Sequence, residues 1–179
     1  DTSLIGRELG RRFPAPTLFP AALSAAADAI VYWAENRFFR PVSLYVSGSN
    51  IDHLPPSLQT DRALMRGLPP PDAATVQRAA RRNAPLVRAQ IPQIEAMLAD
   101  GRAWIAGPAP AAADLAVYHA LWFITARTAL LAHELAPYPR IAAWMGRVRG
   151  FGHGTSTPLD ASEALRIAAA ATPETARPS

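Results

Sequence analysis

Residues 110–123 read PAAADLAVYHALWF, and a single carboxylate, Asp114, stands in a stretch that is otherwise almost entirely apolar. A helix with apolar residues on nearly every side is typical of the centre of a bundle, and its first N–H groups would be buried without partners. If Ala111 is the N-cap, Asp114 falls at the third helical position. From there a carboxylate can accept the N–H of the N-cap residue, and its negative charge interacts favourably with the helix dipole. We interpret Asp114 as the structural cap of a buried helix start. A buried general base is the alternative.

The composition agrees with a folded, helical protein. Of the 179 residues, 50% are hydrophobic and 18% are charged, so the chain can form a substantial core. Long stretches space their apolar residues as helices do, and none alternates Val, Ile or Thr as a half-buried strand would. We therefore predict an all-α fold, a bundle of helices around one buried central helix.

Charge and cysteine content narrow the possible functions. The 18 basic residues are all arginine and give a net charge of +4, and the densest group is Arg78, Arg81, Arg82 and Arg88. We expect that group to form a solvated helix face or to line a subunit cleft, and no nucleic-acid partner is expected. The absence of cysteine excludes disulfides and thiolate catalysis within the chain and fits a cytoplasmic protein. The four histidines have no carboxylates at metal-binding spacing, and no apolar run is long enough to cross a bilayer, so we expect neither a metal nor a membrane partner.

Apolar residues at helical spacing predict six helices. They cover Asp1–Arg12, Ala21–Val46, Ala73–Ala99, Ala111–Leu135, Pro139–Val148 and Ser162–Ala171. Pro41 is expected to kink or end the second helix, and Pro85 and Pro92 to bend the third. A break is also expected near Arg127, inside the fourth.

The connections differ in length and composition. Phe13–Pro20 reads FPAPTLFP, and its three prolines predict an extended linker and a domain boundary. Ser47–Asp72 is long and rich in Pro, Gly, Ser and Asn, with a short helix expected around Gln59–Arg66. Loops of this length are usually functional or mobile, so this insertion could adjust a subunit interface or form a pocket lid.

Three motifs, taken in order, resemble the glutathione S-transferase family. ADLAVY (113–118), preceded by WIAGP (104–108), is similar to the start of that family's buried central helix, which carries a Ser/Thr-x-x-Asp capping box. Asp114 matches the acid of that box, and Ala111 stands where the hydroxyl residue would be. YPRIAAW (138–144) resembles the family's following helix, and DTSLI (1–5) resembles the segment that closes its thioredoxin-like N-terminal domain.

The resemblance implies two parts, with residues 1–20 as the last helix and linker of a truncated thioredoxin-like domain and residues 21–179 as an all-helical C-terminal domain. It implies glutathione as co-substrate, with Asp1 and Thr2 as glutathione-binding residues. A helix N-terminus offers N–H groups to a carboxylate, a hydroxyl donates to it, and an acid accepts from an ammonium group. The alternative is that both residues only cap their helix. The Ser, Tyr or Cys that stabilises the thiolate would precede Asp1, so no catalytic residue is expected in this chain.

The resemblance also implies that the helix Ala21–Val46 faces the glutathione thiol. We expect Tyr32, Asn36 and Arg37 to be polar contacts to the electrophile and Phe123 to form a wall. The alternative for each is a partly exposed helix residue without such a role. Three tryptophans are expected in the core rather than the site, namely Trp33, Trp122 and Trp144.

The function expected from these parts is conjugation of glutathione to an electrophilic small molecule by a homodimer whose Ala21–Val46 and Ala73–Ala99 helices pack across a two-fold axis. The main alternative is a binding or interaction module of the same fold without turnover, since fold does not guarantee function. A weaker alternative is an arginine-rich nucleic-acid module. We expect His119 to pack beside the central helix and the other histidines to lie on the surface.

Overall fold

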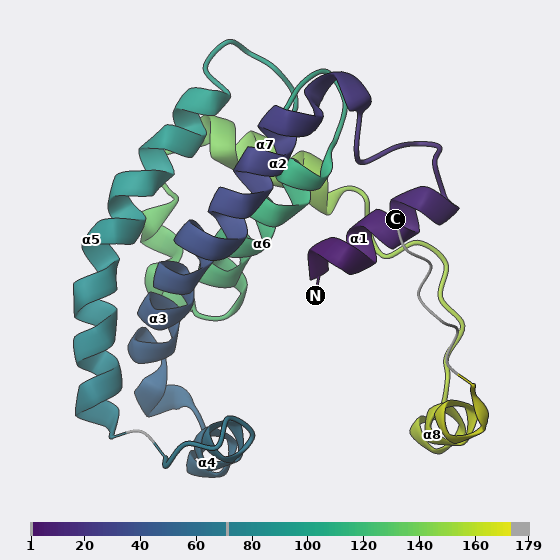
Figure 1. Cartoon of the computed structure of the whole chain (residues 1–179). Helices are drawn as coiled ribbons and strands as arrows, with labels where there is room; N and C mark the ends of the chain where they lie inside the picture. Colours follow the sequence, from purple (N-terminus) through teal and green to yellow (C-terminus); the bar gives the residue numbers. More distant parts are fainter. Residues whose placement is uncertain (1, 71, 173–179) are drawn as a thin grey trace.

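The computed structural model describes residues 2–70 and 72–172, and within these ranges it contains eight α-helices and no strand. Figure 1 shows a bundle of long helices, with α1 beside it and α8 standing apart from it. The all-α fold predicted from the sequence is therefore confirmed. The α-helices follow one another as α1 Thr2–Arg12, α2 Ser24–Trp33, α3 Phe39–Ser49, α4 Pro56–Leu64, α5 Ala73–Met97, α6 Ala112–Ala126, α7 Pro139–Arg149 and α8 Ala161–Ala170.

Helix α6 is the centre of the bundle, as its sequence predicts. It packs against α2, α3 and α7, and Figure 1 shows it enclosed among them. Its fully buried residues are Ala113, Asp114, Val117, Ala120, Leu121 and Ile124. Arg127 is its C-cap, and a 3₁₀ helix over Ala129–Glu134 follows, so the break expected near Arg127 is also present.

The start of α6 is closed by Asp114, which is completely buried. Its Oδ2 accepts the N–H of the N-cap residue Ala111 at 3.0 Å, the bond expected from the sequence. Its Oδ1 accepts two more donors at 2.8 Å, the backbone N–H of Ile105 and the indole N–H of the buried Trp144. The carboxylate therefore joins the helix start, the preceding loop and helix α7. This set of partners satisfies a charge that would otherwise be costly to bury.

The linker that precedes α2 also contributes to this helix start. The carbonyl of Leu18 accepts the N–H of Ala112, the first residue of α6, at 2.9 Å. The first turn of a helix has N–H groups without partners in the helix, so the linker supplies an acceptor that the helix lacks. Residues 13–20 are not helical, as the prolines of FPAPTLFP predict.

The helix expected over Ala21–Val46 is interrupted earlier than predicted. A 3₁₀ turn over Ala21–Leu23 leads into α2, a π-helical segment over Ala34–Phe38 follows, and α3 then continues to Ser49. Pro41 does not end the helix but lies in the first turn of α3. A proline in a helix lacks an N–H, and its ring crowds the turn that precedes it. The turn that precedes Pro41 is the π segment, which is wider than an α-helical turn.

Helix α5 is one long helix of 25 residues, as predicted, with Pro85 and Pro92 inside it and with Val87, Ile91 and Ile94 buried in the core. One further expectation needs correction. The stretch Ser47–Asp72 is more ordered than expected. It contains the end of α3, a 3₁₀ turn over Ile51–His53 and helix α4, which begins three residues before the short helix predicted there.

Candidate functional site

A pocket of about 730 Å³ opens beside the outer face of α6. Three walls enclose it: α1 with the following linker, the face shared by α2 and the π segment, and α6. The wall from α2, the π segment and the first residue of α3 contributes Tyr32, Glu35, Asn36 and Phe39. The pocket therefore lies where the N-terminal helix meets the bundle.

The wall formed by α1 is held to α2 by polar contacts. Arg7 donates from Nη2 to Oδ2 of Asp28 at 2.8 Å, and its guanidinium lies 5.3 Å from the centre of the Phe19 ring. The hydroxyl of Ser3 donates to Oε2 of Glu35 at 2.9 Å. Both ion-paired side chains are about half exposed, so these contacts orient α1 while contributing little stability.

The wall formed by α6 carries an aromatic platform. The imidazole of His119 stacks on the ring of Phe39, with centroids 4.6 Å apart, and Phe123 meets Phe39 edge-on at 5.5 Å. Leu115 and Ala116 line the same wall. A flat, polarisable surface of this kind suits an unsaturated or aromatic small molecule.

The structure brings some of the sequence-predicted residues together at this pocket. Thr2, Tyr32 and Asn36 line it, and the side chain of Tyr32 is 61% exposed. Arg37 is exposed but is not among the lining residues, and Phe123 reaches the pocket only through its contacts with Phe39 and His119. Asp1 lies outside the described residues.

Sequence reasoning missed His119 and Glu35 as lining residues. His119 was expected to pack beside the central helix, but it lies on that helix and is exposed to the pocket. The signal was present in the sequence, because Leu115 and His119 stand at i and i+4 and therefore share a face that need not be buried. Trp144 is buried as expected, whereas Trp33 and Trp122 pack against the core while remaining partly exposed.

The described residues contain no group of three or more His, Asp or Glu side chains that could hold a metal ion. Among the helices described, none combines the length and apolarity that a membrane crossing requires. The lining of the pocket combines hydroxyl, amide, carboxylate and aromatic groups.

Comparison with known proteins defines the class of this fold. Residues 75–147 match the family described as glutathione S-transferase, C-terminal domain. A solved structure of a GST-like protein from Pseudomonas syringae is 25% identical with a TM-score of 0.64, and the match covers 99% of this chain and 53% of that one. A glutathione S-transferase from Rhodospirillum rubrum F11 is similar in fold, at 21% identity and a TM-score of 0.59, and the match covers 100% of this chain and 68% of that one. No curated protein matches the sequence significantly.

The bundle around α6 thus has the fold of a glutathione S-transferase C-terminal domain. Over residues 75–147 the chain is similar to the C-terminal domain of the glutathione S-transferase family, which confirms the resemblance seen in the sequence motifs. The chain spans about half the length of the Pseudomonas syringae protein.

Proposed function

We propose that this chain forms the helical domain of a glutathione transferase and supplies the wall of its electrophile pocket. The observation that carries the proposal is the pocket of about 730 Å³, which has Thr2 and Ser3 of α1 on one side and Tyr32, Asn36 and an aromatic platform on the other. One side suits the amino-acid end of a peptide, and the other suits a flat apolar reactant. A reaction between two small molecules needs both, held together in one cleft.

Glutathione would bind with its γ-glutamyl end at the start of α1. The N–H groups of a helix N-terminus attract a carboxylate, and the hydroxyl of Thr2 can donate to the same group. Asp1, proposed as the acceptor for the ammonium group, precedes Thr2 in the sequence. These assignments rest on the family relationship and on the position of Thr2 at the pocket.

The electrophile would lie against α6 and the π segment. We propose that Tyr32, Asn36 and Arg37 contact its polar groups and that Phe123 supports the aromatic platform from behind. The amide nitrogen of Asn36 donates to the carbonyl of Tyr32 at 3.0 Å, which leaves the amide oxygen as the group for a ligand. The thiolate would attack the electrophile, and a residue of a thioredoxin-like domain, outside this chain, would stabilise that thiolate.

The exposed apolar face of α1 supports the proposed division at residue 20. Ile5 and Leu9 of α1 are 60% and 52% exposed, Phe13 directly after the helix is 68% exposed, and no residue of α1 is buried. An amphipathic helix normally covers its apolar face with another element, here proposed to be the rest of a thioredoxin-like domain. A cytoplasmic homodimer that packs through the helices within 21–46 and 73–99 completes the proposal.

Glutathione titration and conjugation assays on the full-length protein test this function. We expect glutathione to bind and to be conjugated to 1-chloro-2,4-dinitrobenzene. Thr2→Val should weaken glutathione binding several-fold, and the exposed Thr60→Val on α4 should not. Tyr32→Phe should raise KM for the electrophile without changing glutathione affinity, whereas Tyr138→Phe, away from the pocket, should change neither.

Binding of glutathione without turnover would favour the alternative, a non-catalytic module of the same fold. Loss of glutathione binding in Thr60→Val as well as Thr2→Val would contradict the assigned glutathione end of the pocket. The absence of both binding and turnover would overturn the proposal as a whole.

A further inference from the structure

The face of α6 that lines the pocket continues beyond the pocket toward the end of the helix. Leu115 and His119 lie in the pocket, and the same face then carries Trp122, Phe123 and Arg127 at helical spacing. His119 and Arg127 are exposed, whereas Trp122 and Phe123 are partly buried against the core. A ligand that fills the pocket therefore has a further open surface next to it, along α6.

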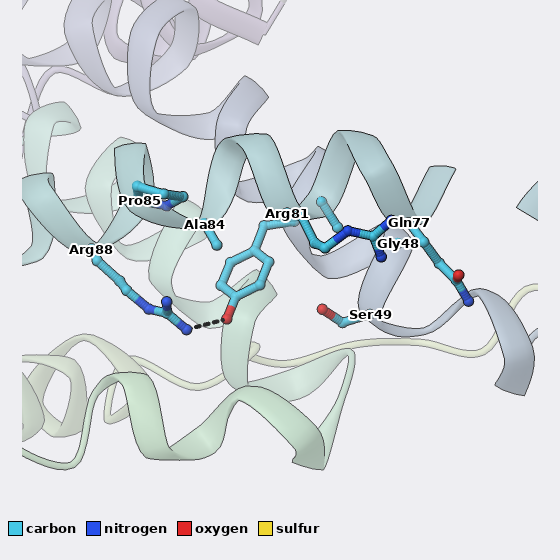
Figure 2. Close-up of a pocket in the computed structure, with 9 residues that line it drawn as sticks. Gly48, Ser49, Gln77, Arg81, Ala84, Pro85 and Arg88 are labelled. Carbon is cyan, nitrogen blue, oxygen red and sulfur yellow. Dashed lines mark hydrogen bonds between the residues drawn. The ribbon is translucent and has the colours of Figure 1, made fainter. Parts of the chain in front are cut away.

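This surface lies apart from the interface that is proposed for the dimer. A groove of about 400 Å³ between α3 and α5, which Figure 2 shows with Gly48 and Arg81 on it, lies on the helices through which the dimer is proposed to pack. Trp122, Phe123 and Arg127 lie on neither of those helices. The end of α6 can therefore contact a ligand while the proposed dimer is formed.

The side chain of Arg127 turns back along α6 over this face. Its guanidinium lies 5.3 Å from the centre of the Trp122 ring and 5.8 Å from that of the Phe123 ring. Phe123 in turn meets Phe39 edge-on at 5.5 Å and lies 6.4 Å from the ring of His119. Cation–π contacts favour this position of the guanidinium. The cation is thus held one ring away from the aromatic platform of the pocket.

The charge of Arg127 has no acidic partner. Within the described part of the chain its guanidinium makes no ion pair. The acids of the pocket lie next to α1, where Asp28 pairs with Arg7 at 2.8 Å and Glu35 accepts the hydroxyl of Ser3 at 2.9 Å. The open face is therefore negative at Glu35 and positive at Arg127. This difference would orient a ligand that carries one negative group, with that group at Arg127.

We infer that the electrophile of this pocket is an aromatic anion and that Arg127 selects it by pairing with its negative group. Its rings would lie on the platform of Phe39 and His119. The inference rests on the proposed function, because the end of the molecule away from Arg127 would face the proposed glutathione end of the pocket. The planar guanidinium is suited to a carboxylate, which it binds with two parallel hydrogen bonds.

The length of the face indicates the size of this ligand. Arg127 follows His119 by just over two helical turns, which is about 12 Å along the helix axis. The backward turn of the Arg127 side chain shortens the distance from its guanidinium to the platform. Two aromatic rings in line, with a carboxylate at one end, fit this arrangement.

Calorimetric titration of the full-length protein with 4-biphenylcarboxylate, without glutathione, tests the inference. 4-Biphenylcarboxamide has the same shape without the charge and is the matched ligand. We expect the carboxylate to bind about fivefold more tightly than the amide, as an exposed ion pair allows. Arg127→Gln should weaken the carboxylate about fivefold and leave the amide unchanged. The bond from Asn50 to the carbonyl of Arg127 involves the backbone and remains in this variant.

Arg149→Gln is the matched control. Arg149 is exposed, ends helix α7 as Arg127 caps the end of α6, and makes no ion pair within the described ranges. Its substitution should change the affinity for either ligand by less than about twofold, since the ion pair at Arg127 is retained. His119→Ala should weaken both ligands several-fold, because both would lie on its ring.

Four results would overturn the inference. Absence of carboxylate binding would show that the face does not take such a ligand, and equal binding of the amide would show that charge is not recognised. Equal effects of Arg127→Gln and Arg149→Gln would remove the role of Arg127. Unchanged binding of both ligands in His119→Ala would place them away from the platform.

The proposed function has separate readouts on the same wild-type protein, namely glutathione binding and conjugation of the neutral 1-chloro-2,4-dinitrobenzene. Conjugation without a preference for the carboxylate would overturn this inference and leave the proposed function intact. A preference for the carboxylate that depends on Arg127, without glutathione binding or conjugation, would support the ligand class and overturn the proposed function.

Discussion

The two sides of α6 differ in how deeply they are buried and in how their polar groups are bonded. On the side of α7, Asp114 is fully buried and has three donors, and Trp144 beside it is also fully buried. On the side of α1, Leu115 is 39% exposed and His119 faces a pocket. In the part of the chain that the structure describes, no buried side-chain polar atom lacks a hydrogen-bond partner, while the open side exposes polar and aromatic groups to a pocket. Helix α6 is therefore both the core of the fold and a wall of the pocket.

The largest effect is expected from breaking the closed side at Asp114. Asp114→Ala leaves three buried donors, from Ile105, Ala111 and Trp144, without an acceptor. We expect the free energy of unfolding to fall by about 3 kcal/mol or more, measured by urea denaturation. Trp144→Phe removes one donor and leaves a small cavity at a fully buried position, so it should cost less, about 2 kcal/mol. A loss below that of Trp144→Phe would show that Asp114 is not the central partner.

A smaller loss is expected where α3 and α5 touch. Gly48→Val places a side chain against Ala80 and the Val76 carbonyl and should destabilise the protein by about 1–3 kcal/mol. The matched control is Gly146→Ala on α7, where an added Cβ meets nothing within 4 Å. That change should be neutral or stabilise by up to about 1 kcal/mol, because alanine favours helix. Thermal unfolding of both variants shows whether the loss of stability comes from the close contact at Gly48 or from replacing a glycine.

The buried pair Tyr45 and Glu134, which joins α3 to the 3₁₀ helix after α6, predicts a pH dependence of stability. Burial raises the pKa of Tyr45 from 10.0 to about 12, and the adjacent carboxylate of Glu134 adds to the rise. The fold therefore favours the neutral phenol. This contribution to stability is complete below pH 10 and is lost as pH rises from 10 to about 12.

Tyr45→Phe should remove this part of the loss of stability at alkaline pH. At neutral pH it should lower the free energy of unfolding by about 1 kcal/mol, because a hydrogen bond is lost. Unfolding curves across the alkaline range measure the difference. Tyr138→Phe is the control and should retain the wild-type slope. An unchanged slope in Tyr45→Phe would contradict the role of this phenol.

The smallest effect on stability is expected on the open side. His119→Ala removes an exposed ring that stacks on Phe39 and should change the free energy of unfolding by less than about 1 kcal/mol. Under the proposed function the same variant should raise KM for an aromatic electrophile several-fold, measured with glutathione in excess. A large loss of stability with an unchanged KM would show that His119 belongs to the closed side.

Sequence alone predicted the features that depend on local pattern. The buried character of α6, its capping by Asp114 and its end near Arg127 follow from periodicity and from the chemistry of helix ends. The bond from Trp144 to Asp114 spans 30 residues and depends on how α7 packs, which no local rule contains. The long helix expected over Ala73–Ala99, by contrast, followed from periodicity, and α5 runs over Ala73–Met97 with Pro85 and Pro92 inside it.

The candidate site was predicted in part. The sequence pointed to Thr2, Tyr32 and Asn36 through family resemblance, and these residues line one pocket. It did not identify Glu35 or His119, because pocket exposure depends on how α1 lies against α2 and α6. The groove with Arg81 was anticipated only as a possible cleft, since the close approach at Gly48 that forms its floor is a tertiary feature.

The π-helical segment Ala34–Phe38 has a consequence for how this protein can change over generations. A turn of this kind amounts to one residue inserted into a regular helix, which rotates everything after it by about 100° relative to everything before it. Removing one residue there would turn Tyr32 away from its present direction relative to the core side chains of α3. A single deletion could therefore reshape ligand preference while the rest of the bundle keeps its arrangement.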